Sequence, residues 1–280
     1  HFMEFLIRMA PVSIPVMIFG YSTCLVLEKF RLFGFGAEMP QSAYDVLVMR
    51  DRIQSSELST RDKIRLITQA VCCVWLVIAL AFHFAAVGLI GLSIIVLATT
   101  FCGVTTEEEV GKAFTESMPF CALLCVFFVI VTIIAQQNLF NPFIEWVFSI
   151  PKETQIPVFY LANGFISAVS DNVFVATIYI EQVHEALINQ IITPDHYNDL
   201  AIAINAGTNL PSVATPNGQS AFLFLLTSAI APLVRLPYVR MMWMALPYTI
   251  VLTIVGLLAT MWIIPEVTPY FEQWGWIPSS

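Results

Sequence analysis

Five stretches of this chain contain no Lys, Arg, Asp or Glu, and they decide what the chain can fold into. The stretches cover residues 9–27, 66–106, 117–144, 200–234 and 241–265. Apolar segments of this length are not solvated as loops, and a helix needs about 20 residues to cross the hydrocarbon core of a bilayer. Only 11% of the residues are charged and 58% are hydrophobic, whereas about a quarter of a soluble domain is charged. We therefore predict an all-α polytopic membrane protein and exclude a single soluble globular domain.

Basic residues indicate which connections face the cytoplasm. Seven of the 12 Lys and Arg residues lie between the first and the second stretch, namely Lys29, Arg31, Arg50, Arg52, Arg61, Lys63 and Arg65. Since positively charged loops stay on the cytoplasmic side, residues 34–65 are predicted to be a cytoplasmic connection. The stretch 66–106 is long enough for two helices, with a turn at residues 85–88. Arg235 and Arg240 mark a second cytoplasmic turn before the last span.

Two further segments are predicted to lie at the membrane–water interface. Residues 105–116 combine an acidic run with apolar positions, which suits a helix in the interface plane, and a span is expected to follow at 118–137. The tail after Pro265 is rich in Tyr and Trp, which fits an aromatic belt at the outer interface.

A first interruption of a membrane helix is expected at Ser170-Asp171-Asn172, which lie within an apolar stretch. An acidic segment, 181–199, follows this stretch. No Lys or Arg occurs between Lys152 and Arg235, so a complete crossing here leaves a cytoplasmic loop without a basic residue, which the positive-inside rule disfavours. We predict a re-entrant hairpin over residues 155–190 with its tip near Asp171, and a complete crossing is the alternative.

A second interruption is expected within residues 199–234. Residues 205–218 contain two Pro and two Gly and carry no charge, and an unbroken helix through Pro211 and Pro216 is disfavoured. We therefore predict a broken helix over 199–234. The alternative is an ordinary loop at the membrane surface, although such a loop normally carries charge.

Both interruptions are candidate ion sites. Non-helical backbone at membrane depth occurs where protein or a watery cavity satisfies its amide and carbonyl groups, and secondary transporters use unwound carbonyls and half-helix ends to coordinate ions. Side chains that carry oxygen are abundant in both breaks, and such ligands suit a hard cation such as sodium. The candidate ligands are Ser170, Asp171 and Asn172 in the first break, and Asn205, Thr208, Asn209, Ser212, Thr215 and Asn217 in the second.

Asp171 is the strongest individual candidate, because its flanking segments are apolar and no basic residue is near it in sequence. A charge at the bilayer centre costs about 2.5–3.5 kcal/mol on insertion scales, so it has to be offset by a bound cation, by protonation or by a cavity. Since desolvation favours the neutral form of a carboxyl group, sodium and a proton are expected to compete for Asp171. The alternative is that Asp171 only caps the helix that follows it.

Other polar side chains are assigned no transport role. His83 is expected to hydrogen-bond a neighbouring helix, and His184 and His196 are expected to be solvated in the acidic outer segment. The six cysteines lack the spacing of metal ligands, and neither a cofactor nor a nucleic-acid partner is expected. An intramembrane aspartyl protease needs two carboxylates that share a proton, and neither an HExxH motif nor a GxSxG motif is present, so we do not expect an enzyme.

Two segments carry a family resemblance. Residues 167–175 read SAVSDNVFV and residues 205–219 read NAGTNLPSVATPNGQ. Both closely resemble the NhaB-type bacterial sodium/proton antiporters. The likeness extends to residues 62–67, 111–117 and 243–249, and it covers essentially the whole chain.

The resemblance implies a multi-pass protein of the bacterial inner membrane with the fold of the broader ion-transporter superfamily. That fold has two inverted repeats, each with a re-entrant hairpin and a broken helix. Family members are about twice this length, so residues 1–280 are expected to form a single transmembrane domain that is the C-terminal part of a longer transporter. This part contains one repeat plus flanking helices, and its partner is the missing N-terminal half; a homodimer is also compatible with the resemblance.

The activity that the resemblance implies is exchange of cytoplasmic Na⁺, and also Li⁺, for external H⁺ by alternating access. One alternative is an anion carrier of the same superfamily, for dicarboxylates or arsenite. The embedded segments offer no Arg or Lys to an anion, although helix N-termini can bind one. Another alternative is a structural half that is inactive without the N-terminal repeat.

Overall fold

The computed structural model describes residues 2–36, 41–56, 59–82, 84–104, 106–137, 141–170, 172–227 and 230–278, and these residues form helices without a β-strand. Two residues singled out from the sequence, His83 and Asp171, lie outside this described part of the chain. The chain divides into two compact units: one contains His1–Phe5 and Met39–Val126, and the other contains Leu6–Glu38 and Phe127–Ser280.

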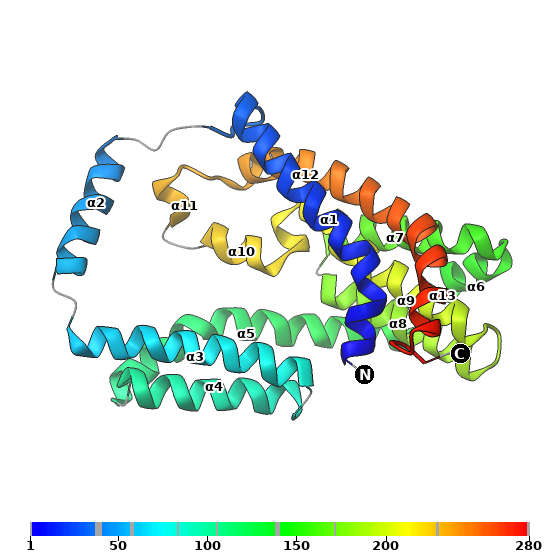
Figure 1. Ribbon diagram of the computed structural model, residues 1–280, viewed down its shortest axis with the longest axis horizontal. Coiled ribbons are helices and arrows are strands. Elements are labelled where there is room, and N and C mark those ends of the chain that lie inside the picture. Colours follow the sequence, from blue (N-terminus) through cyan, green and yellow to red (C-terminus); the bar gives the residue numbers. More distant parts are fainter. Residues whose placement is uncertain are drawn as a thin grey trace. The chain divides into compact units, whose positions relative to one another are not determined.

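The first unit is built on a pair of helices joined by a short turn, α3 (Thr60–Phe82) and α4 (Val87–Cys102). They lie side by side (Figure 1), and the indole Nε1 of Trp75 on α3 donates a hydrogen bond of 3.0 Å to Ser93 Oγ on α4. At the other end, Arg61 donates to the carbonyl of Gly103, 3.3 Å away, just after α4. The turn that the sequence predicts at residues 85–88 overlaps the gap between these helices only in part, because Val87 and Gly88 already belong to α4.

Two further helices, α2 (Gln41–Ser56) and α5 (Glu107–Gln136), precede and follow this pair in the sequence. The predicted cytoplasmic connection contains α2. In addition, α5 is one continuous helix in place of an interface helix followed by a separate span. Its start is well specified, because the Thr106 hydroxyl accepts a hydrogen bond from the Glu109 N–H at 3.3 Å and the acidic first turn complements the helix dipole.

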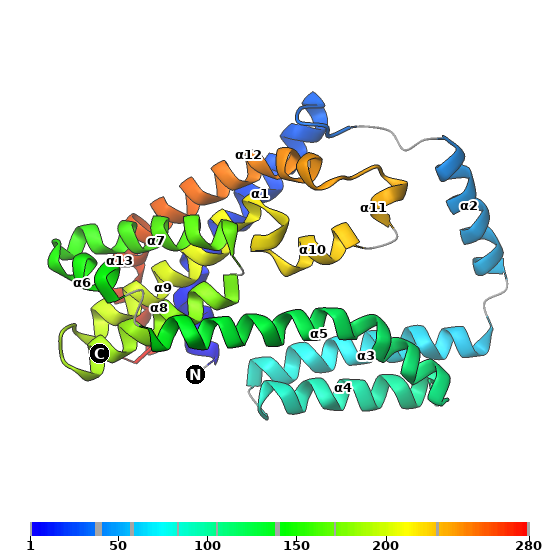
Figure 2. The ribbon, with the colours of Figure 1, turned by 180° about the vertical axis from the view of Figure 1, so that it is seen from behind.

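The second unit contains most of α1 (Phe2–Phe30) and the helices of the C-terminal half of the chain. These are α6 (Asn141–Ser149), α7 (Lys152–Val169), α8 (Asn172–Ile188), α9 (Pro194–Asn209), the 3₁₀ turns η1 (Pro211–Ala214) and η2 (Pro216–Gly218), α10 (Ser220–Thr227), α11 (Ile230–Leu233), α12 (Tyr238–Leu258), the π turn η3 (Ala259–Ile263) and α13 (Ile264–Gln273). Figures 1 and 2 show α7, α8 and α9 gathered together, with α1 and α12 running past them.

Two apolar clusters hold this unit together. In the first, Phe159 on α7 and Tyr179 on α8 are fully buried and meet edge to face, with ring centroids 6.1 Å apart. In the second, Val12 on α1 packs with Tyr160 on α7 and Ala203 on α9. Because α7 and α9 contribute to both clusters, they form the rigid centre of the unit.

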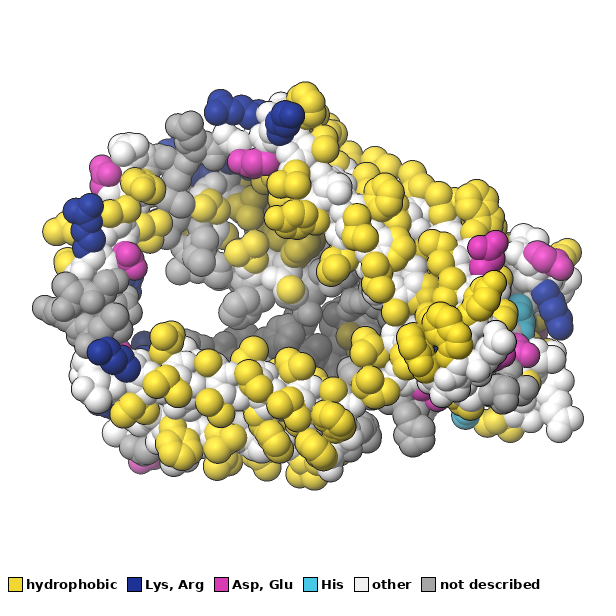
Figure 3. Space-filling view, viewed as in Figure 1, with side chains coloured by type: hydrophobic (Ala, Val, Ile, Leu, Met, Phe, Trp, Pro, Cys, Tyr) yellow, Lys and Arg dark blue, Asp and Glu magenta, His cyan; other side chains and the backbone are white. Residues whose placement is uncertain are grey.

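Long apolar helices agree with a membrane protein. Three stretches of the described chain are long and apolar enough to cross a bilayer: Met3–Phe30, Thr60–Phe82 and Tyr238–Gln273. Hydrophobic side chains cover the outward faces of α1 and α12 and of the α3–α4 pair (Figure 3). Met17 on α1, Val77 on α3 and Val239 on α12 are all more than 60% exposed. Such surfaces match the hydrocarbon of a bilayer rather than water.

The last long helix continues beyond the span that the sequence predicts. The chain stays helical from Tyr238 to Gln273, because the π turn η3 joins α12 to α13. Pro265 does not end the helix; it stands in the first turn of α13, a position that tolerates a residue without an N–H.

Candidate ion site

The first break separates α7 from α8. Ser170 follows α7 with an extended backbone, φ −111° and ψ 176°, and its N–H still donates to the Ile166 carbonyl at 2.9 Å. Asn172 begins α8. Between these two residues the sequence has Asp171, of which the structure describes nothing.

The second break follows from two prolines. α9 ends at Asn209, the turns η1 and η2 each begin with a proline, and a regular helix resumes only at Ser220. Between the turns, Thr215 is extended, with φ −135° and ψ 152°. Because proline has no N–H, Pro211 cannot donate to the carbonyl of Gly207 four residues before it, and the helical ladder stops there.

Side chains cover the carbonyl groups at the end of α9. The Thr208 carbonyl accepts a hydrogen bond of 2.5 Å from Ser167 Oγ. The next carbonyl, that of Asn209, accepts from Ser212 Oγ at 2.9 Å and from Gln219 Nε2 at 2.8 Å. A helix end inside a protein needs such partners, so the broken segment is held by specific contacts and not left as a loose loop.

The two breaks contact each other directly. The Thr215 hydroxyl donates to the carbonyl of Ala168 at the end of α7, at 2.5 Å. The Asn172 Nδ2 donates to Asn209 Oδ1 at 2.9 Å, and Asn209 Nδ2 in turn donates to both the carbonyl and the side-chain oxygen of Asn205, each at 2.8 Å. A chain of three amide side chains therefore runs from the first break into the second.

Two glycines allow this close approach. A Cβ on Gly207 would lie 2.5 Å from the carbonyl oxygen of Tyr160, and a Cβ on Gly218 would lie 2.7 Å from the carbonyl oxygen of Ser167. Both distances are far below van der Waals contact with backbone atoms that have no freedom to move away. The crossing of α7 over the second break therefore requires residues without a side chain.

Burial varies among the predicted ligands. Thr208 and Ser212 are fully buried, Ser170, Asn172, Asn205 and Thr215 are partly exposed, and Asn209 and Asn217 are exposed. Among the described residues, Asn217 makes none of the side-chain hydrogen bonds that join the breaks, so the structure does not bring it into the network. Apart from Asp171, the segments 155–180 and 200–219 carry no charged side chain.

Two residues of the network are not among the predicted ligands. Ser167 ties α7 to the end of α9, and Gln219 binds both the Asn209 carbonyl and Ser212 Oγ, the latter at 2.8 Å. Gln219 stands in an uncharged stretch directly after the second proline turn, and this position is the signal that identifies it. Ser167 has no such signal, because a serine inside an apolar helix often bonds only to its own backbone.

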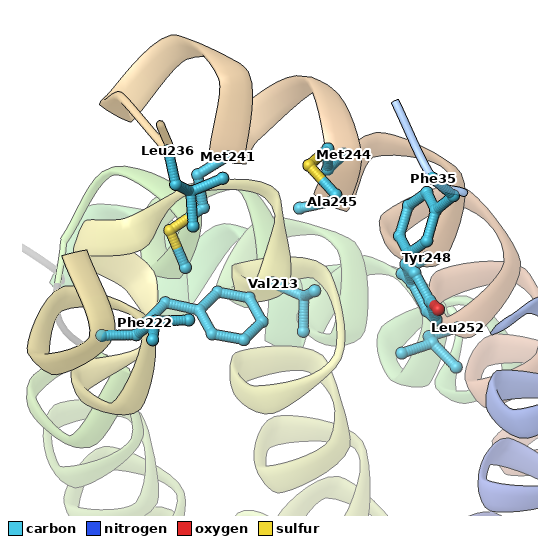
Figure 4. Close-up of a pocket in the computed structure, with 10 residues that line it drawn as sticks. Phe35, Val213, Phe222, Leu236, Met241, Met244, Ala245, Tyr248 and Leu252 are labelled. Atoms are coloured by element: carbon cyan, nitrogen blue, oxygen red, sulfur yellow. The ribbon is translucent and has the colours of Figure 1, made fainter. Parts of the chain in front are cut away.

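An apolar cavity of about 380 Å³ lies behind the second break, within the same unit. Its lining, drawn in Figure 4, comes from the residues Phe35, Val213, Phe222, Leu225, Leu236, Met241, Met244, Ala245, Tyr248 and Leu252. The oxygen groups of the break do not line this cavity. It offers space beside η1 and α10 but no ligands for an ion.

The amino-terminal end of α9 contains a histidine that the sequence does not place correctly. His196 was expected to be solvated, yet it is only 8% exposed, and its Nε2 lies 2.7 Å from Gln155 Oε1. Gln155 Nε2 donates to the Ile150 carbonyl, so Gln155 Oε1 is left to accept the imidazole proton. Burial lowers the pKa of His196, and the positive charge of Lys152 lowers it further. His184 is exposed, as expected.

Comparisons with known proteins agree with the sequence patterns. Residues 1–279 match the family described as bacterial Na⁺/H⁺ antiporter B (NhaB). The chain is 58% identical over 277 residues to the Na⁺/H⁺ antiporter NhaB of Tolumonas auensis. The matched region covers 99% of this chain and 53% of that protein. The corresponding proteins of Haemophilus influenzae strain Rd and Escherichia coli O6:K15:H31 are 57% and 56% identical, each with 99% of this chain and 54% of the relative covered.

The chain thus spans about half the length of the curated relatives that it matches. No solved structure matches it.

Proposed function

Because the chain belongs to the NhaB family of bacterial Na⁺/H⁺ antiporters, we propose that it is part of a multi-pass transporter of the bacterial inner membrane that exchanges cytoplasmic Na⁺ for external H⁺. Li⁺ is expected to replace Na⁺, as another small hard cation. The transporter is not an enzyme, and its substrates are the ions themselves.

The observation that best supports this proposal is the contact between the two helix breaks. It gathers amide, hydroxyl and carbonyl oxygens from α7, α8 and α9 without any fixed positive charge. A dehydrated sodium ion requires such a set of oxygen ligands. We propose that sodium binds where the breaks meet, with Asp171 as its charged ligand and Ser170, Asn172, Asn205, Thr208, Asn209, Ser212 and Thr215 as neutral oxygen donors or their supports.

The amide groups of the proposed site satisfy one another. Asn209 Oδ1 accepts from Asn172, and Asn205 Oδ1 accepts from Asn209. A sodium ion attracts the same oxygens, so its binding replaces hydrogen bonds within the protein and leaves few oxygens without a partner. Because these oxygens have a partner with or without sodium, the free-energy cost of the sodium-free state is low. A carrier needs this property to return across the membrane without sodium.

Protons enter the same scheme at the carboxyl group. In a site without a basic side chain, the Asp171 carboxylate is neutralised either by sodium or by a proton. Competition between the two ions for one carboxylate couples the outward movement of one to the inward movement of the other. Alternating access, with the two breaks facing each side of the membrane in turn, then gives antiport.

The other functions considered from the sequence have less support. An anion carrier has no Lys or Arg among the described residues of the two breaks to meet its substrate. The proposal that the chain is one of two inverted repeats, inactive without the other half, agrees with its coverage of about half of each relative. Assembly with that missing half, or as a homodimer, is proposed on the same basis.

Sodium-driven loss of a pH gradient in everted membrane vesicles that lack other antiporters tests the proposal. The chain is compared with a version completed to the length of its relatives. We expect exchange with Na⁺ and Li⁺ in the completed protein, and no effect of dicarboxylates or arsenite on it. Correctly inserted protein without any exchange would contradict the antiporter assignment, and competition by an anion would support the anion carrier.

A further inference from the structure

One face of α7 carries a polar residue that none of the interactions between the breaks uses. Tyr160, Asn163, Gly164 and Ser167 follow the spacing i, i+3, i+4 and i+7, so they share one side of the helix. Tyr160 and Gly164 pack against Gly207 of α9, and Ser167 bonds to the carbonyl of the next residue of α9. Asn163 therefore lies within the interface between α7 and α9, and its side chain is fully buried.

The amide of Asn163 is only half satisfied. Its Nδ2 donates to the Phe159 carbonyl at 2.6 Å. Its Oδ1 is buried and has no hydrogen-bond partner among the residues that the structure describes. Buried polar atoms nearly always have a partner, and one that lacks a protein partner points to a bound water molecule or ion.

The two hydroxyl groups described on this interface, those of Ser167 and Thr208, have no proton left to donate to Asn163. The hydroxyl proton of Ser167 is used on the Thr208 carbonyl, and that of Thr208 is used on the carbonyls at Ile204 and Asn205. The Gly207 carbonyl lies 3.2 Å from where a Cβ on Gly164 would stand, and Pro211 supplies it with no N–H. These residues therefore offer no hydroxyl donor to Asn163 Oδ1, and a cation is a partner that this oxygen can bind directly.

We propose that Asn163 Oδ1 is a ligand for a dehydrated sodium ion in the interface between α7 and α9. Asn163 precedes Ser167 by one helical turn, so this position lies next to the contact between the breaks but outside the set of residues assigned to it. The inference rests on the proposed sodium transport and adds a protein ligand on the inner face of α7. A water molecule at the same oxygen is the competing occupant, and the experiment separates the two.

The test compares Asn163→Leu with the parent in the full-length antiporter, because leucine has a similar size and no oxygen. Asn217→Leu is the matched control, since Asn217 is exposed and lies outside the network. The measurements are thermal unfolding of the purified protein with and without NaCl, and the sodium concentration that gives half-maximal exchange. We expect Asn163→Leu to unfold without sodium at the parental temperature or higher, because a buried unpaired acceptor has been removed. We also expect it to lose most of the stabilisation by sodium and to need about tenfold more sodium for exchange.

A parental response to sodium in Asn163→Leu, together with loss of that response in Asp171→Asn, would overturn this inference and assign a water molecule to Asn163 Oδ1. A parent that shows no response to sodium at all would instead contradict the proposed function itself. If Asn163→Leu does not fold, Asn163→Asp carries the test, because it keeps an oxygen at the same place and adds a charge. Its response to sodium should then become stronger and depend on pH, and an unchanged response would overturn the inference.

Discussion

Amide side chains are the most informative residues of this protein. Asn172, Asn209 and Asn205 form a chain of hydrogen bonds. Each of these amide groups also has a carbonyl oxygen that can bind a cation. An amide can change partner without changing charge, so it suits a site that must be stable both with and without its cation. At the residue scale the account therefore depends on which Asn residues belong to the chain and which do not.

Asn209→Ala should weaken sodium binding, because it removes the amide that joins the first break to Asn205. We expect the sodium concentration for half-maximal exchange to rise about tenfold, as when an outer ligand of a metal site is removed. Asn217→Ala is the control, since Asn217 is an exposed Asn of the same break that lies outside the network. Equal effects of the two substitutions in the vesicle assay would show that the chain of amides does not bind the ion.

The elements that matter most are α7 and α9 and the turns that follow α9. Their backbones are so close that glycine is required where they cross, and the carbonyls of Thr208 and Asn209 at the end of α9 accept hydrogen bonds from side chains of other segments. The geometry of the site therefore depends on how these two helices pack where they cross. Changes in this packing should affect both stability and transport.

Gly207→Ala should separate α7 from α9, because the new methyl group meets the Tyr160 carbonyl oxygen at 2.5 Å. Overpacking of this kind costs about 1–3 kcal/mol, and the exchange rate should fall with it. Gly111→Ala is the control, since a Cβ there has no neighbour within 4 Å and alanine favours a helix. Thermal unfolding of the purified proteins checks this, and equal stability of the two variants would contradict the tight crossing.

The amino-terminal end of α9 should make stability depend on pH. His196 has a lowered pKa in the folded protein, whereas an unfolded chain gives it a value near 6.5. The folded state thus binds fewer protons than the unfolded state between these two values. The contribution of His196 to stability is fully present above about pH 6.5 and is lost as the pH falls towards the lower pKa of the folded state.

His196→Gln should reduce this loss, because glutamine can still donate to Gln155 and does not take up a proton. His184→Gln is the control, since His184 is exposed, and it should keep the parental dependence. Unfolding temperatures measured between pH 7.5 and 5.5 decide the point. Parallel curves for the parent and His196→Gln would show that the buried histidine does not titrate in this range.

At the scale of the whole molecule, the sequence predicts the apolar helices well. A long stretch without charge has few alternatives to a membrane helix, and α1, α3 and α12 lie where such stretches occur. The helix interruptions at Ser170 and after Asn209 are likewise present where polar residues and proline stand. Local chemistry is enough for these features.

Other features depend on contacts between distant residues and could not be predicted. Ser167 and Gln219 have roles only because α7 crosses the second break, and the hydrogen bonds that join the breaks link residues 37 to 47 positions apart. His196 looks solvated in an acidic segment, yet it is buried and contacts Gln155, which is 41 positions away in the sequence. The continuation of the last helix through Pro265 depends on a π turn, which no local pattern of residues indicates.

The central claim is that sodium binds where the two breaks meet, in competition with a proton on Asp171. Equilibrium binding of radioactive sodium to the purified full-length protein, measured as the pH is lowered, tests it most directly. We predict saturable binding at alkaline pH that is displaced as protons are added and that Asp171→Asn abolishes, while Asn217→Ala leaves it intact. Sodium binding that persists in Asp171→Asn with the same dependence on pH would contradict the account.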